Sequence, residues 1–410
     1  MNDLNVTSTE TTPRLKEAWK NFHDAQTEVL GWMEDTQRFK DHPQHRAKAY
    51  HTMLEALAMA YNFAVAPRMT YPRLFKNTGW QTDVYTLGQN GPDLYYAVAF
   101  LDGRQTYKLT GRYGDLVLIL AQVISHLSGH PDSTAIGNYD FSTFDINPDG
   151  SFEITISATP QERNWIKLDA ALPYHFLLFR RFMGDWHDDP GELKLERISE
   201  IPDDYYDYDE FSEEGIAVRI DRATEFLKYL VKDFNINLFN FYTAHAGYNN
   251  MRFLPGTITS QVGSPSSNYA MLVFDLADDE ALVLELDELP DGVYWSFQAG
   301  DVWSRSLNFT NEQTTVNMRH GVVDEDGVFR AVVSHRDPGY LNWIDTRRRE
   351  QGTVVFRNYR ATREPVPKTR KVKFADLATL MLPTSAKITP EARATELKRR
   401  AAGYLKLHGE

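Results

Sequence analysis

The sequence of 410 residues contains no cysteine. Disulfide bonds, thiolate nucleophiles and thiolate metal ligands are therefore excluded, although this absence alone does not fix the compartment. The longest largely apolar run, residues 116–124, is far shorter than the roughly 20 residues that cross a bilayer as a helix. The N-terminus, MNDLNVTSTETT, lacks the basic start and apolar centre of a secretory signal. We therefore expect a cytoplasmic protein without a membrane span.

Common cofactor and nucleophile motifs are also missing. The sequence has no P-loop, GxGxxG or GxSxG pattern, which argues against nucleotide-dependent and common nucleophilic mechanisms. Acidic residues outnumber basic ones 57 to 44, and the resulting net charge of −13 opposes attraction to a phosphate backbone. We expect no cofactor, no nucleic-acid partner and no membrane partner.

Two short patterns imitate metal sites but depart from them. Residues 145–150 resemble the opening of a calcium loop, yet Ile156 stands where the final glutamate ligand is needed. His126 and His130 have the spacing of ligands on a helix, but the residues between them favour a loop and no glutamate joins them. We expect no metal site.

Helices are predicted at both ends and in the middle of the chain. Thr12 caps a helix that begins at Pro13 and runs to about Lys40, and Thr389 with Pro390 opens a C-terminal helix. A second helix follows Pro43, and its apolar stripe is expected to pack in the core: Tyr50, Met53, Leu54, Leu57, Ala58 and Tyr61. A connecting helix has apolar residues at three- and four-residue spacing: Ile220, Ala223, Phe226, Leu227, Leu230, Val231 and Phe234.

An internal repeat is the most informative feature of the chain. Matched residues lie 177 or 178 positions apart, and the pairs are Phe152 with Phe329, Asn164 with Asn342, Trp165 with Trp343, and Arg180 with Arg357. Upstream the match is weaker and places Phe100 opposite Phe274. In both copies an Asp-Gly pair precedes alternating apolar and polar residues, as a turn entering a half-buried strand should.

The repeat predicts antiparallel sheets packed face to face. The expected fold is mainly β with α additions, in two tandem β-sandwich or jelly-roll-like units. We expect five regions, which are a helical N-terminal region (1–70), a first β-sandwich unit (71–200), an acidic linker with a connecting helix (201–254), a second β-sandwich unit (255–366) and a C-terminal tail with a helix (367–410).

A family resemblance accompanies the second copy. It is carried by Tyr294-Trp295-Ser296, Asp337-Pro338-Gly339 and Asn342-Trp343, within the segment from about residue 268 to 361. This segment resembles the C-terminal domain of a bacterial family of unknown function, and the Asn90–Asp93 and Leu109–Gly111 regions are similar to the N-terminal half of full-length members. The resemblance implies a β-sandwich of jelly-roll type and brings no established activity.

The densest polar cluster, residues 334–345, lies in a predicted loop between strands, where sites tend to occur. His335 is the candidate general acid or base because an imidazole titrates near neutral pH, and Asp337 or Asp345 is the candidate that orients it. The first copy has Ala158 in place of His335, so any catalytic site is expected in the second copy. Alternatively, these residues are structural. Pro338 and Gly339 then only shape a turn, Asn342 hydrogen-bonds to the backbone, and Trp343 fills the core of the sandwich.

A candidate substrate-binding set surrounds this cluster, and its members are Tyr294, Trp295, Trp303, Tyr340, Asn342 and Arg357. The aromatic members line a pocket or, at strand spacing, belong to the core. Arg180 and Arg357 either pair with carboxylates of the protein or bind an anionic substrate bidentately.

Three functions stay open at this point. The first is a cofactor-independent hydrolase or lyase that acts on a small organic or glycosidic substrate by His/Asp acid–base chemistry. The second is a non-catalytic carbohydrate- or metabolite-binding module, and the third is a structural β-sandwich protein, for which assembly into a homo-oligomer is natural. An enzyme requires His335 and a carboxylate to converge in one concave pocket, whereas a binding module does not.

Overall fold

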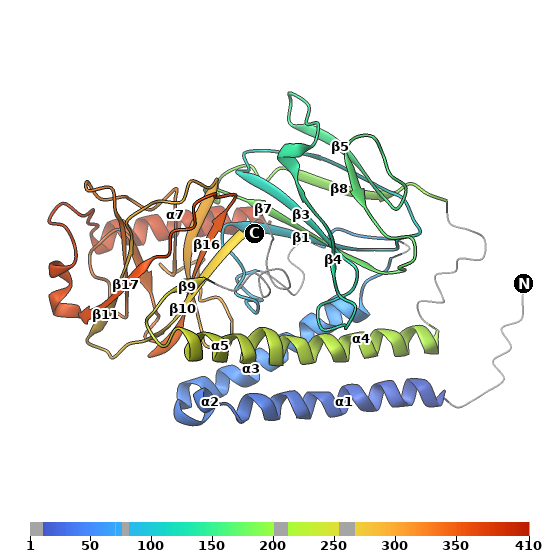
Figure 1. Cartoon of the computed structure of the whole chain (residues 1–410), viewed down its shortest axis with the longest axis horizontal. Coiled ribbons are helices and arrows are strands. Elements are labelled where there is room, and N and C mark those ends of the chain that lie inside the picture. Colours follow the sequence, from blue (N-terminus) through green and yellow to red (C-terminus); the bar gives the residue numbers. More distant parts are fainter. Residues whose placement is uncertain (1–10, 70, 76–81, 201–211, 254–266, 410) are drawn as a thin grey trace, which may run out of the picture.

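The computed structural model describes residues 11–69, 71–75, 82–200, 212–253 and 267–409. Two β-sandwiches lie side by side, and a layer of helices runs along one side of them (Figure 1). The first ten residues and most of the predicted acidic linker lie outside the described residues.

The first sandwich is built from two four-stranded sheets, ordered β1-β7-β3-β4 and β6-β5-β2-β8. The strands are β1 (Leu94–Leu101), β2 (Tyr107–Arg112), β3 (Leu118–Ile124), β4 (Ala135–Asp140), β5 (Ser151–Ser157), β6 (Trp165–Lys167), β7 (His175–Phe182) and β8 (Glu192–Arg197). Leu101, Ile154 and Phe179 lie in the core between the two sheets. Alternation along β2 and β5 buries one face of each strand, as the sequence predicted.

The second sandwich repeats this plan with sheets ordered β13-β12-β16-β10-β9 and β15-β14-β11-β17. Its strands are β9 (Arg252–Phe253), β10 (Ser267–Asp275), β11 (Glu280–Leu286), β12 (Tyr294–Gly300), β13 (Thr315–Asn317), β14 (Phe329–Ser334), β15 (Trp343–Asp345), β16 (Gln351–Tyr359) and β17 (Lys368–Lys373). Phe274, Phe297 and Phe356 lie in its core. Since β17 pairs with β11, this unit extends past the predicted boundary at residue 366.

The two Asn-Trp pairs occupy equivalent positions in the two units. Trp165 begins β6, which pairs in parallel with β5, and Trp343 begins β15, which pairs in parallel with β14. The Trp165 indole donates to the carbonyl of Ser157 at 3.0 Å, and the Trp343 indole donates to the Ser334 hydroxyl at 3.0 Å. Mainly β architecture with two repeated units is therefore confirmed.

The upstream alignment of the repeat was wrong by one residue. Phe100 packs against the helical layer, whereas Phe274 lies inside the second sandwich. The structural match of Phe274 is Leu101, because Leu101 pairs with His175 as Phe274 pairs with Gly352, 177 residues later. A shift of one residue moves every side chain of a strand to the opposite face, so the correction changes which residues meet the helices.

The helices begin largely where their caps predicted. They are α1 (Pro13–Glu34), α2 (Gln37–Asp41), α3 (Pro43–Ala60), the π-helical turn η1 (Tyr61–Val65), α4 (Glu213–Val231), the π-helical turn η4 (Lys232–Asn237), α5 (Leu238–His245) and α7 (Pro390–His408). The Thr12 hydroxyl accepts a hydrogen bond from the backbone of Leu15, and Thr389 accepts one from that of Ala392. The first predicted helix ends at Glu34 rather than near residue 40. No helix within the described ranges combines the length and apolarity that a membrane span needs.

The apolar stripe predicted for α3 was assigned to the wrong face. Tyr50, Leu54 and Tyr61 are 48%, 67% and 58% exposed, so packing in the core is wrong for these three. The buried face instead carries small residues such as Ala49, Ala56 and Ala60 together with Met53 and Met59. Alanine lets neighbouring helix backbones approach closely, which a hydrophobicity pattern weighted toward large side chains does not detect.

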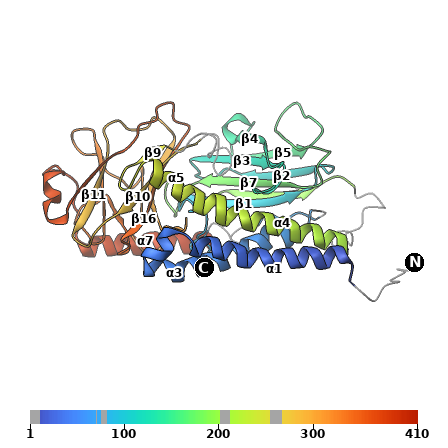
Figure 2. The same ribbon diagram turned by 60° about the horizontal axis from the view of Figure 1, so that its bottom comes forward.

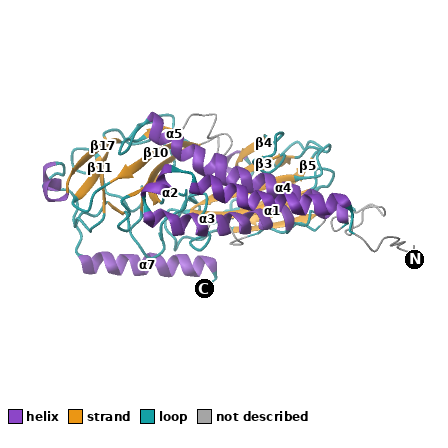
Figure 3. Cartoon of the chain, turned by 90° about the horizontal axis from the view of Figure 1, so that it is seen from below, coloured by secondary structure: helices purple, strands orange, loops and turns teal. Residues whose placement is uncertain are grey.

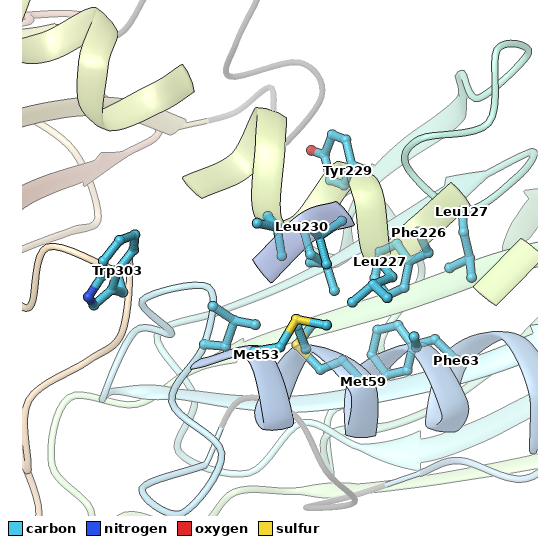
Figure 4. Close-up of a cluster of buried hydrophobic side chains, with 14 of the residues drawn as sticks. Met53, Met59, Phe63, Leu127, Phe226, Leu227, Tyr229, Leu230 and Trp303 are labelled. Carbon is cyan, nitrogen blue, oxygen red and sulfur yellow. The ribbon is translucent and has the colours of Figure 1, made fainter. Parts of the chain in front are cut away.

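The sheets ordered β1-β7-β3-β4 and β13-β12-β16-β10-β9 are the front sheets, and the helical layer lies along their outer faces (Figure 2). Met59 of α3 and Phe63 of η1 point toward Phe226 and Leu230 of α4 (Figure 4). The same cluster includes Val355 from the second sandwich, so one apolar layer joins both units.

Helix α7 lies apart from the other helices (Figure 3) and bridges the two units. Near its start, Arg393 forms an ion pair with Asp337 of the second unit at 2.7 Å. Farther along, Arg399 forms one with Asp185, which follows the last strand of the first front sheet, also at 2.7 Å. Tyr404 packs on Trp186 nearby.

Trp343 does not fill the core of the sandwich, so that expectation was wrong. Its indole lies on the outer face of the β15-β14-β11-β17 sheet, packed with Tyr340, Leu377 and Met381. The guanidinium of Arg393 lies 5.0 Å from the ring centroid. Trp165 has no such cover and is only half-buried.

We predict that Trp343→Ala lowers the free energy of unfolding by about 3 to 5 kcal/mol, because it empties a packed aromatic site. Trp165→Ala should cost clearly less, since its ring is half-exposed. Urea denaturation of both variants measures the difference. Equal losses at the two positions would contradict the unequal packing described here.

Candidate functional site

The imidazole of His335 is held by structural partners. It is 8% exposed, its Nδ1 lies 2.5 Å from the Thr346 hydroxyl, and its Nε2 lies 3.1 Å from the carbonyl oxygen of Leu276. Both ring nitrogens are therefore engaged within the fold, one to a hydroxyl and one to backbone.

The two candidate aspartates are engaged elsewhere. Asp337 accepts hydrogen bonds from Arg393 at 2.7 and 3.2 Å and from the backbone of Gly339 at 2.8 Å. Asp345 accepts from the backbone of Arg347 at 2.7 Å. Among the described residues, no hydrogen bond or ion pair joins either carboxylate to His335.

The candidate substrate-binding aromatics are dispersed. Trp295 lies in the core of the second sandwich, Trp303 lies in the helical layer, and Tyr340 lies beside Trp343 on the outer sheet. The Tyr294 hydroxyl donates to the buried carboxylate of Asp93 at 2.5 Å. These residues do not form one pocket.

Asn342 serves the backbone, as the alternative interpretation expected. Its side-chain amide donates to the carbonyl oxygens of Val322 at 2.7 Å and Arg330 at 2.8 Å. Of the predicted substrate-binding residues, Arg357 is the one whose position has not yet been described.

Arg357 lines a cavity of about 150 Å³ where the two front sheets meet the helical layer. One part of the wall is polar, and its residues are Gln89, Asn90, Tyr96, Gln122, Arg180, Tyr269, Arg357 and Tyr359. The rest is mostly apolar and includes Met59, Phe63, Ile124, Leu127, Phe176, Leu178, Phe226, Leu230 and Phe234. The described residues that line this junction pocket include two arginines and no carboxylate.

The two arginines are repeat equivalents with equivalent glutamine partners. Arg180 on β7 donates from Nη1 to the side-chain oxygen of Gln122 on β3 at 3.2 Å. Arg357 on β16 donates from Nη1 to the side-chain oxygen of Gln298 on β12 at 2.5 Å, and from Nη2 to the carbonyl of Gln89. They are only 7% and 6% exposed. The duplication has thus placed two buried guanidinium groups, each bonded to a neutral amide oxygen, in one pocket.

Tyrosines complete the polar wall. Tyr96 pairs with Arg180 across β1 and β7, and Tyr269 pairs with Arg357 across β10 and β16. The hydroxyls of Tyr269 and Tyr359 lie 2.8 Å apart. Burial raises the pKa of both Tyr96 and Tyr359, although the positive charges of Arg357 and Arg180 oppose that rise. These phenols therefore stay protonated near neutral pH and can donate hydrogen bonds.

Unusual backbone conformations surround this pocket. Phe63 lies in the π-helical turn η1, and Phe234 lies in the π-helical turn η4. Gln89 has a φ of 48°, a left-handed conformation that is uncommon for residues other than glycine. π-Turns and left-handed residues are enriched at functional sites, so their convergence on one cavity favours a site there.

This geometry defines the class of the protein. It is a duplicated β-sandwich with a pocket of about 150 Å³ where the two units meet the helical layer. The model of a family described as a protein of unknown function, DUF1214, matches the chain over residues 97–184 and 275–363. The family model is thus found twice in the chain, once in each sandwich. No curated protein matches the sequence.

The fold is shared with a solved structure. A protein of uncharacterised function from Burkholderia cenocepacia is 26% identical, with a TM-score of 0.78 over 88% of this chain and 97% of that chain. The VPA0106 protein from Vibrio parahaemolyticus is 12% identical, with a TM-score of 0.46 over 88% of this chain and 100% of that chain.

Sequence reasoning missed most of the junction pocket. Arg180 and Arg357 were noted as a pair, but features common to both copies were interpreted as architecture. Gln122 and Gln298 lie 176 residues apart, and Tyr96 and Tyr269 lie 173 apart, so insertions between strands hid their equivalence. Strand-by-strand alignment of the repeat is the signal that finds them.

We predict that His335→Gln destabilises the protein by about 1 to 3 kcal/mol, because the buried Thr346 hydroxyl and Leu276 carbonyl lose well-placed partners. The exposed His23→Gln is the control and should leave the denaturation midpoint unchanged. An unaltered midpoint for His335→Gln, together with lost turnover of any substrate, would restore the catalytic hypothesis.

Proposed function

We propose that the protein binds a small organic carboxylate with an apolar body in the junction pocket. The single observation that carries the proposal is the pair of buried guanidinium groups, Arg180 and Arg357, beside an aromatic wall. Arginine recognises carboxylates through two parallel hydrogen bonds. A cavity of about 150 Å³ holds a group the size of benzene.

The electrostatics of the pocket support an anionic ligand. Burying a cation is costly unless it is paired, and the partners described for Arg357 are neutral oxygens. A bound carboxylate would place a negative charge next to Arg357, in surroundings that are largely apolar. The protonated phenols of Tyr96 and Tyr359 would donate further hydrogen bonds to it.

Catalysis stays a prediction. The hydrolase or lyase activity expected from the sequence relied on His335 with an aspartate, and the described partners of these residues do not support that pair. The metabolite-binding alternative is the function that the geometry supports best. A cytoplasmic location and a bacterial origin stay predictions as well.

Benzoate and hexanoate should raise the thermal denaturation midpoint, because a ligand that binds the folded state stabilises it. The uncharged benzamide and hexanamide match them in shape and should bind much more weakly. Differential scanning fluorimetry followed by calorimetric titration measures both. Equal binding of acids and amides would overturn the proposal.

Replacing either arginine should abolish most of the affinity. We predict that Arg357→Gln and Arg180→Gln each weaken benzoate binding roughly thirtyfold or more, since each removes a buried charge that contacts the anion. Arg181→Gln is the matched control, because this neighbour is also buried but bonds the backbone of Tyr95 and Pro190 outside the pocket. Equal effects at residues 180 and 181, in folded proteins, would contradict the assignment.

A further inference from the structure

A second cavity of about 300 Å³ lies next to the junction pocket. The two cavities share three lining residues, which are Ile124, Ser128 and Tyr229. The outer cavity is otherwise lined by Gly129, His130, Pro131, Ser133, Thr134, Ala135 and Asp233. Gly129 and Asp233 are exposed, so this outer cavity reaches the protein surface, whereas none of the described residues that line the junction pocket is exposed.

Tyr229 forms the boundary between the two cavities. Its ring comes from α4 and lies at the upper edge of the apolar cluster in Figure 4. Ser128, in the loop between β3 and β4, also lines both cavities, and its side chain opposes the rise in the pKa of Tyr229 that burial causes. Ser128 on the sheet side and Tyr229 on the helix side therefore flank the passage.

The β3–β4 loop is held in shape by its own contacts. The Ser125 hydroxyl accepts from the backbone of Thr134 at 3.0 Å, and the Ser133 hydroxyl donates to the carbonyl of His126 at 3.1 Å. The rings of His126 and His130, considered above as metal ligands, stack with centroids 4.1 Å apart. The loop at the rim of the outer cavity is therefore held by its own hydrogen bonds and ring contact.

Gly129 sets how closely this loop approaches α4. Its φ is +97°, and a Cβ at this position would lie 2.7 Å from the Cβ of Tyr229 and 2.8 Å from the carbonyl oxygen of Glu225. A side chain at residue 129 must therefore push the loop away from the helix, which would widen the passage beside Tyr229.

We propose that the outer cavity is the entrance to the junction pocket and a second subsite for the far end of an elongated carboxylate. Tyr229, opposite Ser128 at the boundary between the cavities, limits the length of ligand that fits. This inference rests on the proposed function. A short acid fills only the inner pocket between the arginines and Phe226, whereas a longer acid must pass the tyrosine.

Titration of hexanoate and decanoate into the wild-type protein, Tyr229→Ala and Gly129→Ala tests this inference. Removing the ring or displacing the loop should improve decanoate affinity relative to hexanoate by roughly tenfold or more, since each added methylene in an apolar site is worth about that factor. Gly327→Ala is the matched control, because Gly327 has a φ of +81° but open space around it. That control should leave the ratio of the two dissociation constants unchanged.

The outcomes distinguish a failure of the entrance assignment from a failure of the proposed carboxylate binding. If no carboxylate binds the wild-type protein, both are overturned. If hexanoate binds but Tyr229→Ala leaves the ratio unchanged, only the entrance assignment is overturned. Should a variant fail to fold, as judged by circular dichroism, Ser128→Ala provides the remaining test. Removing the Ser128 hydroxyl widens the passage beside Tyr229 and should speed decanoate association in stopped-flow measurements.

Discussion

In each sandwich, one sheet is apolar on its outer face as well as on its inner face. The architecture depends on covering these outer faces. Strands β7 and β16 are buried along their whole length, so the sheets that contain them need a partner on both sides. The inner faces pack against the second sheet of the same unit. The outer faces are covered jointly by α3, α4 and the neighbouring unit. This shared cover makes two repeated domains into one body, and the junction pocket lies where the cover is incomplete.

The polar residues of the pocket follow from the same arrangement. Because the repeat preserves the alternation of side chains along β7 and β16, Arg180 and Arg357 both point outward from their own cores. When the outer faces meet the helices, the two arginines arrive in one place. A single sandwich would carry only one of them. Duplication is therefore part of how the pocket is built, because each copy supplies one arginine and at least one tyrosine of its polar wall.

The sequence predicted what depends on local periodicity. The cap at Thr12, the connecting helix and the equivalence of Trp165 with Trp343 are all confirmed. Predictions failed where the same hydrophobic pattern allowed either of two faces of a helix or strand to be the buried one. The exposed stripe of α3 and the displaced Phe100 are of this kind, because a shift of one residue leaves composition unchanged but reverses the direction of a side chain. The polar loop around His335 stands out in the sequence by its density of polar residues alone. The pocket is instead assembled from residues of five strands and four helical segments, which no short stretch of the sequence contains together.

Helix α7 has a consequence for how the protein matures. It follows both sandwiches in the chain, and its ion pairs reach Asp337 in one unit and Asp185 in the other. During synthesis the first sandwich leaves the ribosome well before the second, and this strap across them forms last. Until the second unit is made, the outer face of the first front sheet has only α3 and α4 to cover it. A nascent chain at that stage exposes apolar strand surface that the finished protein hides, so chaperones would distinguish half-made molecules from complete ones.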